Sequence, residues 1–378
     1  MVDISFWREI VDGQRRGIIA SCLRSVLVFL SFFYRLAVCA RNKAYDLGIL
    51  PRRRLPHPVI SVGNLVAGGT GKTPCVRFLA AELQKRGMRV AVLSRGYGAV
   101  RRPHRPPLLV SDGTRILHTA TEAGDETVML AKSLGTAIVI ADPNRLRAGM
   151  MAAREFTVDC FILDDGFQHR ELHRDLDILL LDCDRPFTNG RLLPAGPLRE
   201  PERNVSRADL LIITRCESTP SQKLREKLRT VNARATIFSA RNEATWLVEI
   251  ESGATRDPHS LRGKRIAAFS AIGRPDDFEK TLSSLGAILS SRRAFPDHHF
   301  FDRREIEEII AGASRCGAEA IVTTAKDAVR LPATLSSPIP FFYLDIEMRI
   351  VDGGGKLIES VLRVLNPGDT RGNKESHK

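Results

Sequence analysis

The chain alternates short apolar runs with amphipathic stretches over most of its length. Short apolar runs bounded by turn residues are typical of strands covered on both faces, as in a parallel sheet. Stretches between them have helical spacing, as at 74–86 and 127–134. The alternation therefore predicts an α/β fold with a mainly parallel sheet flanked by helices. The predicted strands are 89–94, 137–141, 160–163, 176–181, 210–214, 235–238, 246–250, 264–269 and 320–324.

The most apolar stretch lies near the N-terminus, at 17–40, and contains Arg24 and Arg35. On a helix these arginines lie about three turns apart and therefore share one stripe. A helix embedded in, or lying on, the cytoplasmic leaflet fits this pattern better than a signal peptide or a full span. A buried amphipathic helix of the soluble fold is the alternative.

The distribution of charge indicates the kind of partner, and the cysteines indicate the state of the thiols. The formal net charge is +13, and the first sixty residues hold ten Lys/Arg against four Asp/Glu, an excess of +6. This placement favours an anionic membrane surface over a nucleic-acid groove, and no nucleic-acid recognition motif is present. The seven cysteines include no C-x-x-C pair. They predict reduced thiols and exclude a disulfide or zinc framework.

Residues 59–74 run from an apolar strand through a glycine turn into the start of a helix. Glycines let backbone amides approach a polyphosphate at a helix N-terminus, a lysine then reaches the terminal phosphates, and a Thr hydroxyl serves Mg²⁺. This predicts a P-loop NTPase-like core, against the alternative of an ordinary glycine turn. Val66 replaces the first glycine of the strict pattern. The predicted nucleotide-binding residues are Val66, Ala67, Gly68, Gly69, Thr70, Gly71, Lys72 and Thr73.

Two further segments carry candidate carboxylates. Asp164 and Asp165 follow four apolar residues, as in a Walker B strand that delivers carboxylates to a magnesium site. A simple strand-to-turn aspartate is the alternative. Asp125 opens a helical stretch, where an acidic residue is expected for dipole reasons alone. His298 and His299 follow Asp297, but no third ligand at zinc spacing accompanies them.

Seven segments together resemble one family, the tetraacyldisaccharide 4'-kinases, which act on the lipid A precursor of the bacterial inner membrane. The segments are SVGNLVAGGTGKTP (61–74), SRGYG (94–98), GDE (124–126), DDGFQHR (164–170), NGRLLPAGPLREP (189–201), FPDHHFF (295–301) and TTAKDA (323–328). The resemblance implies two α/β lobes, an N-terminal membrane-associated helix, and ATP and Mg²⁺. It also implies transfer of the γ-phosphoryl group to the 4'-hydroxyl of tetraacyldisaccharide 1-phosphate. The enzyme would then be peripheral or monotopic on the cytoplasmic face of the inner membrane, with no nucleic-acid partner.

Roles for individual residues follow from the same resemblance. Asp125 matches the family's catalytic base, and His298 matches the histidine that pairs with it. The carboxylates at the magnesium are matched by Asp164 and Asp165, with Glu200 near the metal. Gln168 falls in the nucleotide-site motif. From residue type, Arg95 and Arg199 are candidates to grip the substrate's 1-phosphate or the ATP phosphates.

The predicted organisation has four parts. They are an N-terminal membrane-associated helical region (1–50), a P-loop kinase core (51–240), a C-terminal α/β lobe (241–367) and a disordered polar tail (368–378). The competing class is a partitioning-type ATPase switch that docks on membranes, but Ala67 stands where those proteins carry a signature lysine. A GTPase would need an Asn-Lys-x-Asp motif, which 325–328 does not supply.

Overall fold

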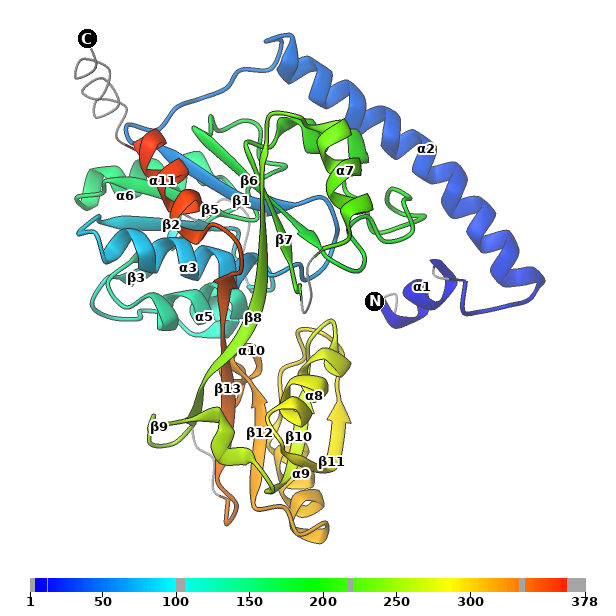
Figure 1. Cartoon of the computed structure of the whole chain (residues 1–378), viewed down its shortest axis with the longest axis vertical. Helices are drawn as coiled ribbons and strands as arrows, with labels where there is room; N and C mark the ends of the chain where they lie inside the picture. The colour runs from blue at the N-terminus through cyan, green and yellow to red at the C-terminus, as the bar shows by residue number, and fades with distance from the viewer. Residues whose placement is uncertain (1–3, 12, 100–105, 217–219, 333–336, 366–378) are drawn as a thin grey trace. The chain divides into compact units, whose positions relative to one another are not determined.

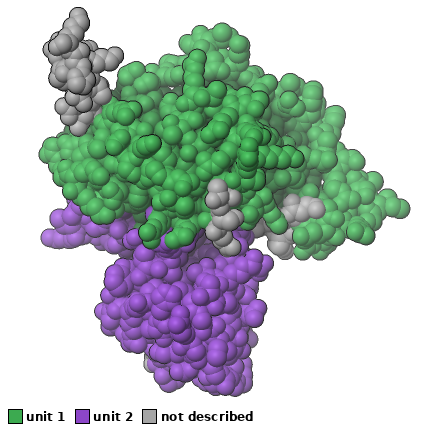
Figure 2. Space-filling view, in the orientation of Figure 1, with its two compact units in different colours: residues 1–95, 142–241, 349–378 green, residues 96–141, 242–348 purple. Residues whose placement is uncertain are grey.

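The computed structural model describes residues 4–11, 13–99, 106–216, 220–332 and 337–365. The chain forms two compact units (Figure 2). Unit 1 comprises 1–95, 142–241 and 349–378, and unit 2 comprises 96–141 and 242–348. Both units are built from separated segments of the chain, whereas the core and lobe predicted from the sequence are contiguous. The predicted tail, 368–378, lies outside the described residues.

Unit 1 contains a parallel sheet in the order β8-β7-β6-β1-β5-β2. Its strands are β1 (Val59–Asn64), β2 (Val90–Ser94), β5 (Cys160–Asp164), β6 (Leu176–Asp182), β7 (Leu210–Thr214) and the first part of β8 (Thr236–Glu249). Its helices are α1 (Ile4–Val11), α2 (Ile18–Asp46), α3 (Lys72–Gln84), α6 (Arg145–Glu155), η1 (Glu202–Arg207), α7 (Gln222–Val231) and α11 (Gly354–Leu365) (Figure 1). Strands β1, β2, β5, β6 and β7 are buried at every position. This burial explains why they appear in the sequence as continuous apolar runs.

Unit 2 contains the parallel order β11-β10-β12-β13, with β13 next to β8. Its strands are β3 (Leu108–Asp112), β4 (Ile138–Ala141), β9 (Thr255–Arg256), β10 (Arg265–Ser270), β11 (Ile288–Ala294), β12 (Ala320–Thr324) and most of β13 (Phe341–Ile350). Its helices are α4 (Ala120–Ala123), α5 (Asp125–Leu134), η2 (Pro258–Leu261), α8 (Pro275–Ser284), α9 (Arg303–Arg315) and α10 (Ala325–Ala328). β3 and β4 pair antiparallel. The predicted α/β fold with a mainly parallel sheet is therefore confirmed.

One strand differs from its prediction. The sequence predicts separate strands at 235–238 and 246–250, whereas β8 runs without interruption over Thr236–Glu249. No glycine or proline occurs within that range, so nothing in the backbone stops an extended strand. The polar residues between the two apolar runs belong to the strand itself, so the prediction of two separate strands is wrong.

The apolar stretch near the N-terminus forms α2, a helix of 29 residues that lies outside the parallel sheet (Figure 1). Within the described ranges, α2 alone has the length and composition of a candidate membrane span, and only 11% of its most apolar window is buried. A core helix of a soluble fold would be mostly buried, so the alternative of a buried amphipathic helix is not what the structure has. Tyr34 and Ser31 of α2 donate hydrogen bonds to the carbonyls of Arg199 (3.0 Å) and Leu192 (3.0 Å) in the loop 189–201.

Candidate active site

The predicted phosphate loop connects β1 to α3 in unit 1. Gly68 and Gly71 have φ values of 134° and 84°, a region that residues with a side chain rarely adopt. Asn64, at the end of β1, donates from Nδ2 to the Gly68 carbonyl (3.3 Å) and to Oγ1 of Thr70 (2.7 Å). Lys72 Nζ lies 3.3 Å from the same Gly68 carbonyl. The loop and its lysine therefore form a compact turn at the N-terminus of α3, where an anion is favoured.

The loop from 189 to 201 packs directly against the phosphate loop. The Ala67 amide donates to the Pro197 carbonyl (2.7 Å), and the Arg199 amide donates to the Leu65 carbonyl (2.7 Å). Val66 is 8% exposed and belongs to the apolar cluster of this loop. The valine that departs from the strict glycine pattern is thus accommodated because its side chain is buried by the neighbouring loop.

Asp165 is the charged residue closest to the loop lysine. Its backbone has a φ of 55° directly after β5, and its carboxylate accepts from Arg199 Nη1 at 2.9 and 2.7 Å. Lys72 Nζ lies 3.6 Å from Oδ1. Burial acts to raise the pKa of Asp165, but the positive charges of Lys72, Arg199 and Arg145 outweigh it and lower the pKa to about 2. This carboxylate is consequently ionised at physiological pH.

Asp164 and Glu200 have different surroundings. Asp164 ends β5, is 4% exposed, and accepts from the Ser94 hydroxyl at 3.4 Å. Glu200 is fully buried, and its Oε2 accepts from Asn42 Nδ2 (2.9 Å) and Asn204 Nδ2 (2.5 Å) and forms an ion pair with Arg207 Nη1 (2.9 Å). Glu200 thus ties α2 to the segment 200–207.

The remaining predicted residues of unit 1 are distributed around the same loop. Gln168 donates from Nε2 to the Asn64 carbonyl (2.9 Å), and Arg199 Nη1 lies 3.4 Å from its Oε1. Thr73 is buried in the first turn of α3. Arg95 is exposed at the end of β2. Across the part of the chain that the structure describes, no group of three or more His, Cys, Asp or Glu side chains could hold a metal ion.

Arg145 was not predicted as a site residue. It begins α6, is 4% exposed, and interacts electrostatically with Asp164, Asp165 and Arg95. Burial lowers its pKa, while the two aspartates act to raise it. The only signal in the sequence is its place a few residues after the apolar run 137–141. A sequence pattern does not show that such an arginine is buried beside two carboxylates.

In unit 2, Asp125 and His298 form a close pair. His298 Nδ1 lies 2.8 Å from Asp125 Oδ2, and Asp125 is 2% exposed. The Glu126 amide donates to Asp125 Oδ1 at 2.8 Å. Burial acts to raise the pKa of Asp125, but the hydrogen bond from His298 and the charges of Lys326 and Arg330 outweigh it, so the pKa lies below its ordinary value. The carboxylate is therefore an ionised acceptor at the start of α5.

His299 has a different partner from its neighbour. Its Nε2 lies 2.9 and 2.8 Å from the two carboxylate oxygens of Glu305, in the first turn of α9, and its ring stacks on Phe295. The backbone of His298 has a φ of 64°, which turns the two successive side chains in different directions. The loop conformation therefore brings His298 to Asp125 and His299 to Glu305.

Two cations next to the Asp125–His298 pair were not predicted as site residues. Lys326 Nζ lies 3.2 Å from His298 Nε2, and Arg330 Nε lies 3.6 Å from Asp125 Oδ2. Arg330 is buried and also donates to Asp327 Oδ1 at 2.5 Å. Lys326 lies in the TTAKDA segment, directly after the buried strand β12. A charged residue at the carboxyl end of a buried strand was the signal available.

Gly124 has a backbone conformation and a close backbone neighbour that exclude a side chain. Its φ is 89°, and an added Cβ would overlap the backbone carbonyl oxygen of Tyr97. We expect Gly124→Ala to lower the free energy of unfolding by about 1–3 kcal/mol. The clashing atom belongs to the backbone of Tyr97, which cannot move aside as a flexible side chain can. Thermal or denaturant unfolding of the purified chain measures this. Gly312→Ala in α9, where a Cβ would meet only Arg315 Nη2 at 3.9 Å, is the matched control and should not be destabilising. Equal stability of the two variants would contradict the prediction.

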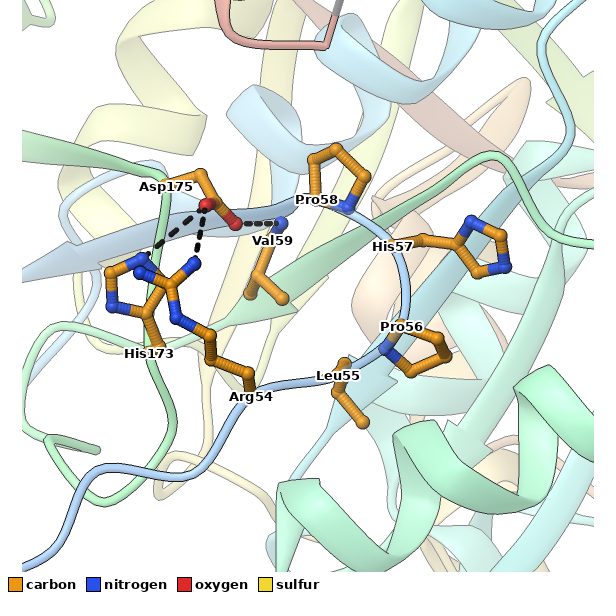
Figure 3. Close-up of a pocket in the computed structure, with 8 residues that line it drawn as sticks. All are labelled: Arg54, Leu55, Pro56, His57, Pro58, Val59, His173 and Asp175. Carbon is orange, nitrogen blue, oxygen red and sulfur yellow. Dashed lines mark hydrogen bonds and ion pairs between the residues drawn. The ribbon is translucent and has the colours of Figure 1, made fainter.

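A small pocket of about 200 Å³ lies at the amino end of β1 (Figure 3). Its Asp175 carboxylate accepts from the Val59 amide (2.8 Å) and lies 3.3 Å from His173 Nε2 and 3.8 Å from Arg54 Nη1. The phosphate loop follows the opposite end of the same strand, about 20 Å away at the rise of an extended strand. The charged side chains of this pocket are thus paired with one another, and the pocket is separate from the phosphate loop.

The residues described above can perform two chemical tasks, which are phosphate binding and proton acceptance. Unit 1 presents a glycine-rich turn, a lysine and two aspartates at the carboxyl ends of adjacent parallel strands, which is where α/β proteins bind phosphorylated ligands. Unit 2 presents an ionised carboxylate oriented by an imidazole, an arrangement able to accept a proton. Together these capacities match the requirements of phosphoryl transfer to a hydroxyl group.

Comparison with known proteins agrees with this chemistry. The family model described as tetraacyldisaccharide-1-P 4'-kinase matches residues 23–366. The tetraacyldisaccharide 4'-kinase of Geobacter sulfurreducens is 41% identical over 347 residues, covering 92% of this chain and 95% of that protein. The enzyme of the same name from Syntrophus aciditrophicus is 43% identical over 334 residues, covering 86% and 89%.

A crystal structure of LpxK from Aquifex aeolicus in complex with ATP is also similar. It matches with a TM-score of 0.74 and 35% sequence identity, covering 91% of this chain and 99% of that one. The predicted P-loop NTPase-like fold is thereby confirmed. From the matched range and the identity over nearly the whole chain, the protein belongs to the tetraacyldisaccharide-1-P 4'-kinase family, whose members are kinases of lipid A biosynthesis.

Proposed function

We propose that this chain transfers the γ-phosphoryl group of ATP to the 4'-hydroxyl of tetraacyldisaccharide 1-phosphate. The observation that carries the proposal is the phosphate loop of unit 1, with Lys72 between the Gly68 carbonyl and the ionised Asp165. In the transfer, the bond from the γ-phosphorus to the ADP oxygen breaks. A bond from that phosphorus to the 4'-oxygen forms, and the hydroxyl proton passes to a base.

The nucleotide is held by the phosphate loop. Backbone amides along the loop surround the phosphates, and the N-terminus of α3 adds its positive dipole end. Lys72 neutralises the terminal phosphates, and Gln168 supports the loop through the Asn64 carbonyl. The proposed nucleotide-binding residues are Val66, Ala67, Gly68, Gly69, Thr70, Gly71, Lys72, Thr73 and Gln168.

The residues beside the loop fit Mg²⁺, which takes oxygen ligands and is commonly held through one or two carboxylates together with phosphates. Thr73, Asp164, Asp165 and Glu200 are the residues proposed to hold it, although the three carboxylates do not form a metal-binding group as they stand in this structure. Oε1 of Glu200 is buried and has no hydrogen-bond partner among the described residues. This oxygen is therefore available as a metal ligand. When bound, Mg²⁺ would supply positive charge that offsets the charge developing on the transferred phosphoryl group.

Asp125 is the proposed base. A sugar hydroxyl is a poor nucleophile near neutral pH, so a carboxylate within hydrogen-bond reach is needed to accept its proton. Asp125 is ionised, buried, and held by both the Glu126 amide and His298. His298 is the proposed residue that orients Asp125. Arg95 and Arg199 are proposed to bind the substrate's 1-phosphate or the ATP phosphates, since a guanidinium group can bind phosphate with two parallel hydrogen bonds.

The membrane-associated region is proposed to be residues 1–50, docked as a peripheral or monotopic element on the cytoplasmic face of the inner membrane. Large apolar side chains along α2 are exposed, including Phe29 (64%) and Phe33 (52%). Basic residues lie at or beyond both ends of the helix, where anionic headgroups would attract them. These residues are Arg15, Arg16, Arg41, Lys43, Arg52, Arg53 and Arg54.

Replacing Phe29 and Phe33 by serine tests the membrane proposal. Each buried Phe side chain contributes about 1.5–3 kcal/mol, so we expect vesicle binding to weaken at least about tenfold. Sedimentation with vesicles containing anionic lipid measures it. Tyr34→Phe removes only the hydrogen bond to the Arg199 carbonyl and is the matched control. Unchanged binding of the double variant would mean that another surface contacts the membrane.

The proposed reaction is tested by transfer of phosphate from γ-labelled ATP to tetraacylated disaccharide 1-phosphate in detergent micelles. The expected product is the lipid with a labelled phosphate at the 4'-position, formed only when Mg²⁺ is present. Hydrolysis of ATP without labelled lipid, stimulated by bare membrane or by protein concentration, would instead support an ATPase switch.

A further inference from the structure

The imidazole of His298 is contacted on both ring nitrogens. Nδ1 lies 2.8 Å from Asp125 Oδ2, and Nε2 lies 3.2 Å from Lys326 Nζ. The ring is also 5.4 Å, centroid to centroid, from that of Tyr97. Asp297 Oδ1 lies 3.9 Å from the same Nε2. The carboxylate of Asp125 accepts a hydrogen bond and therefore requires a proton on Nδ1. The ammonium group of Lys326 donates and therefore requires a lone pair on Nε2.

Lys326 itself is surrounded by carboxylates. Its Nζ lies 3.0 Å from Glu126 Oε1 and 3.2 Å from Asp297 Oδ1, and its side chain is 16% exposed. Burial acts to lower the pKa of Lys326, but Glu126, Asp297 and Asp125 outweigh it and raise the pKa above its ordinary value. Lys326 is therefore a charged ammonium group at every pH at which the enzyme would act.

The identity of these groups determines where the imidazole proton lies. An ammonium group has three donors and no acceptor, so Nε2 can meet Lys326 only as a bare nitrogen with its lone pair. The remaining proton is then on Nδ1, where it donates to the Asp125 carboxylate. A second proton on Nε2 would break the hydrogen bond from Lys326 and place two cations about 3 Å apart, which is unfavourable.

We propose that Lys326 is a positioning residue of the transfer reaction, holding His298 neutral with its proton on Nδ1 so that the imidazole orients Asp125. This inference rests on the proposed function and deepens it. In the neutral form held by Lys326, His298 does not take the hydroxyl proton from Asp125, because Nδ1 already carries a hydrogen and Nε2 is occupied. The proton removed from the acceptor hydroxyl accordingly remains on the Asp125 carboxyl group until product leaves.

The position of the proton can be observed directly. Histidine labelled with ¹⁵N in the full-length chain, in detergent micelles, reports which ring nitrogen is protonated, and His298→Gln identifies the signal among the nine histidines. In the wild type we expect a protonated Nδ1 and a bare Nε2 at neutral pH. A protonated Nε2 overturns the proposal, and this measurement needs no variant of Lys326.

Substitution of Lys326 connects the proton position to the rate. In Lys326→Met the donor to Nε2 is gone, so the imidazole proton should no longer be confined to Nδ1. We expect kcat to fall about 10²-fold, the size of effect that misplacing a catalytic group has, with KM for ATP unchanged because the nucleotide loop is untouched. Lys326→Arg should keep the neutral ring and most of the activity. Lys280→Met, an exposed lysine of α8, is the control and should change neither.

The outcomes separate this inference from the proposed function. An active Lys326→Met variant in which the imidazole proton of His298 stays on Nδ1 overturns the role of Lys326 alone. A wild-type chain that transfers no phosphate to the disaccharide overturns the proposed function instead. Removing Lys326 leaves Glu126 and Asp297 without their shared cation and could unfold the region, so Lys326→Gln, which keeps a donor for Nε2, is measured alongside. It should retain the bare Nε2 and the proton on Nδ1, and a protonated Nε2 in this folded variant would overturn the proposal.

Discussion

Asp125→Asn is expected to slow phosphate transfer to the disaccharide by about 10²–10⁴-fold, the usual contribution of a positioned base. The amide has nearly the shape of the carboxylate but cannot accept the hydroxyl proton. ATP binding should be unchanged, since the phosphate loop does not include this residue. The rate of labelled lipid formation at saturating ATP measures the effect.

The control for this substitution is Asp276→Asn, an exposed acidic residue in the first turn of α8. It should retain wild-type turnover, because only the charge at a helix start is lost. The pKa of Asp125 is below its ordinary value, so its ionisation should not limit the rate above about pH 4. Near wild-type turnover by a folded Asp125→Asn chain would mean that another group is the base.

Lys72→Ala is expected to reduce transfer by about 10²–10³-fold or more, the cost of removing one preorganised group that stabilises charge in the transition state. The side chain is only 12% exposed and lies against the Gly68 carbonyl and Asp165, so no other lysine can take its place. Binding of ATP should weaken as well, because the lysine also contacts the phosphates of the ground state. Transfer assays and equilibrium binding of ATP separate the two effects.

Lys85→Ala is the matched control for the loop lysine. Lys85 follows the C-terminal end of the same helix, α3, and its exposed side chain pairs with Glu82. An exposed pair of this kind contributes little to stability, so the variant should bind ATP and transfer phosphate as the wild type does. If Lys72→Ala and Lys85→Ala behaved alike, the nucleotide would have to bind elsewhere.

The features that could be predicted from sequence are those encoded by neighbouring residues. Strands β2, β6 and β7 were found within one residue at each end because a buried parallel strand is a continuous apolar run with polar ends. The phosphate loop was found because its glycines and lysine are consecutive in the chain. The same local logic misled at β8, where polar residues within one long strand were taken for a break between two strands.

Contacts between residues that are far apart in the chain could not be predicted from local patterns. Asp125 and His298 are 173 positions apart, and from the sequence alone a helix-capping role was the default interpretation of Asp125. The adjacent His298 and His299 have the same side chain, and only the backbone at His298, with a φ of 64°, directs one to Asp125 and the other to Glu305. Family resemblance supplied the pairing, because no local pattern contains it.

The sequence by itself thus determined the α/β class, the nucleotide loop, the exposed apolar helix and, through resemblance, the family. Local periodicity and turn chemistry act over a few residues, which a linear pattern records. Only the tertiary structure decided that Glu200 is buried between two amide donors and an arginine, that Val66 is covered by the loop 189–201, and that Lys326 touches His298. Burial and the electrostatics that follow from it depend on which distant side chains come within a few ångströms, and no segment of the chain specifies that alone.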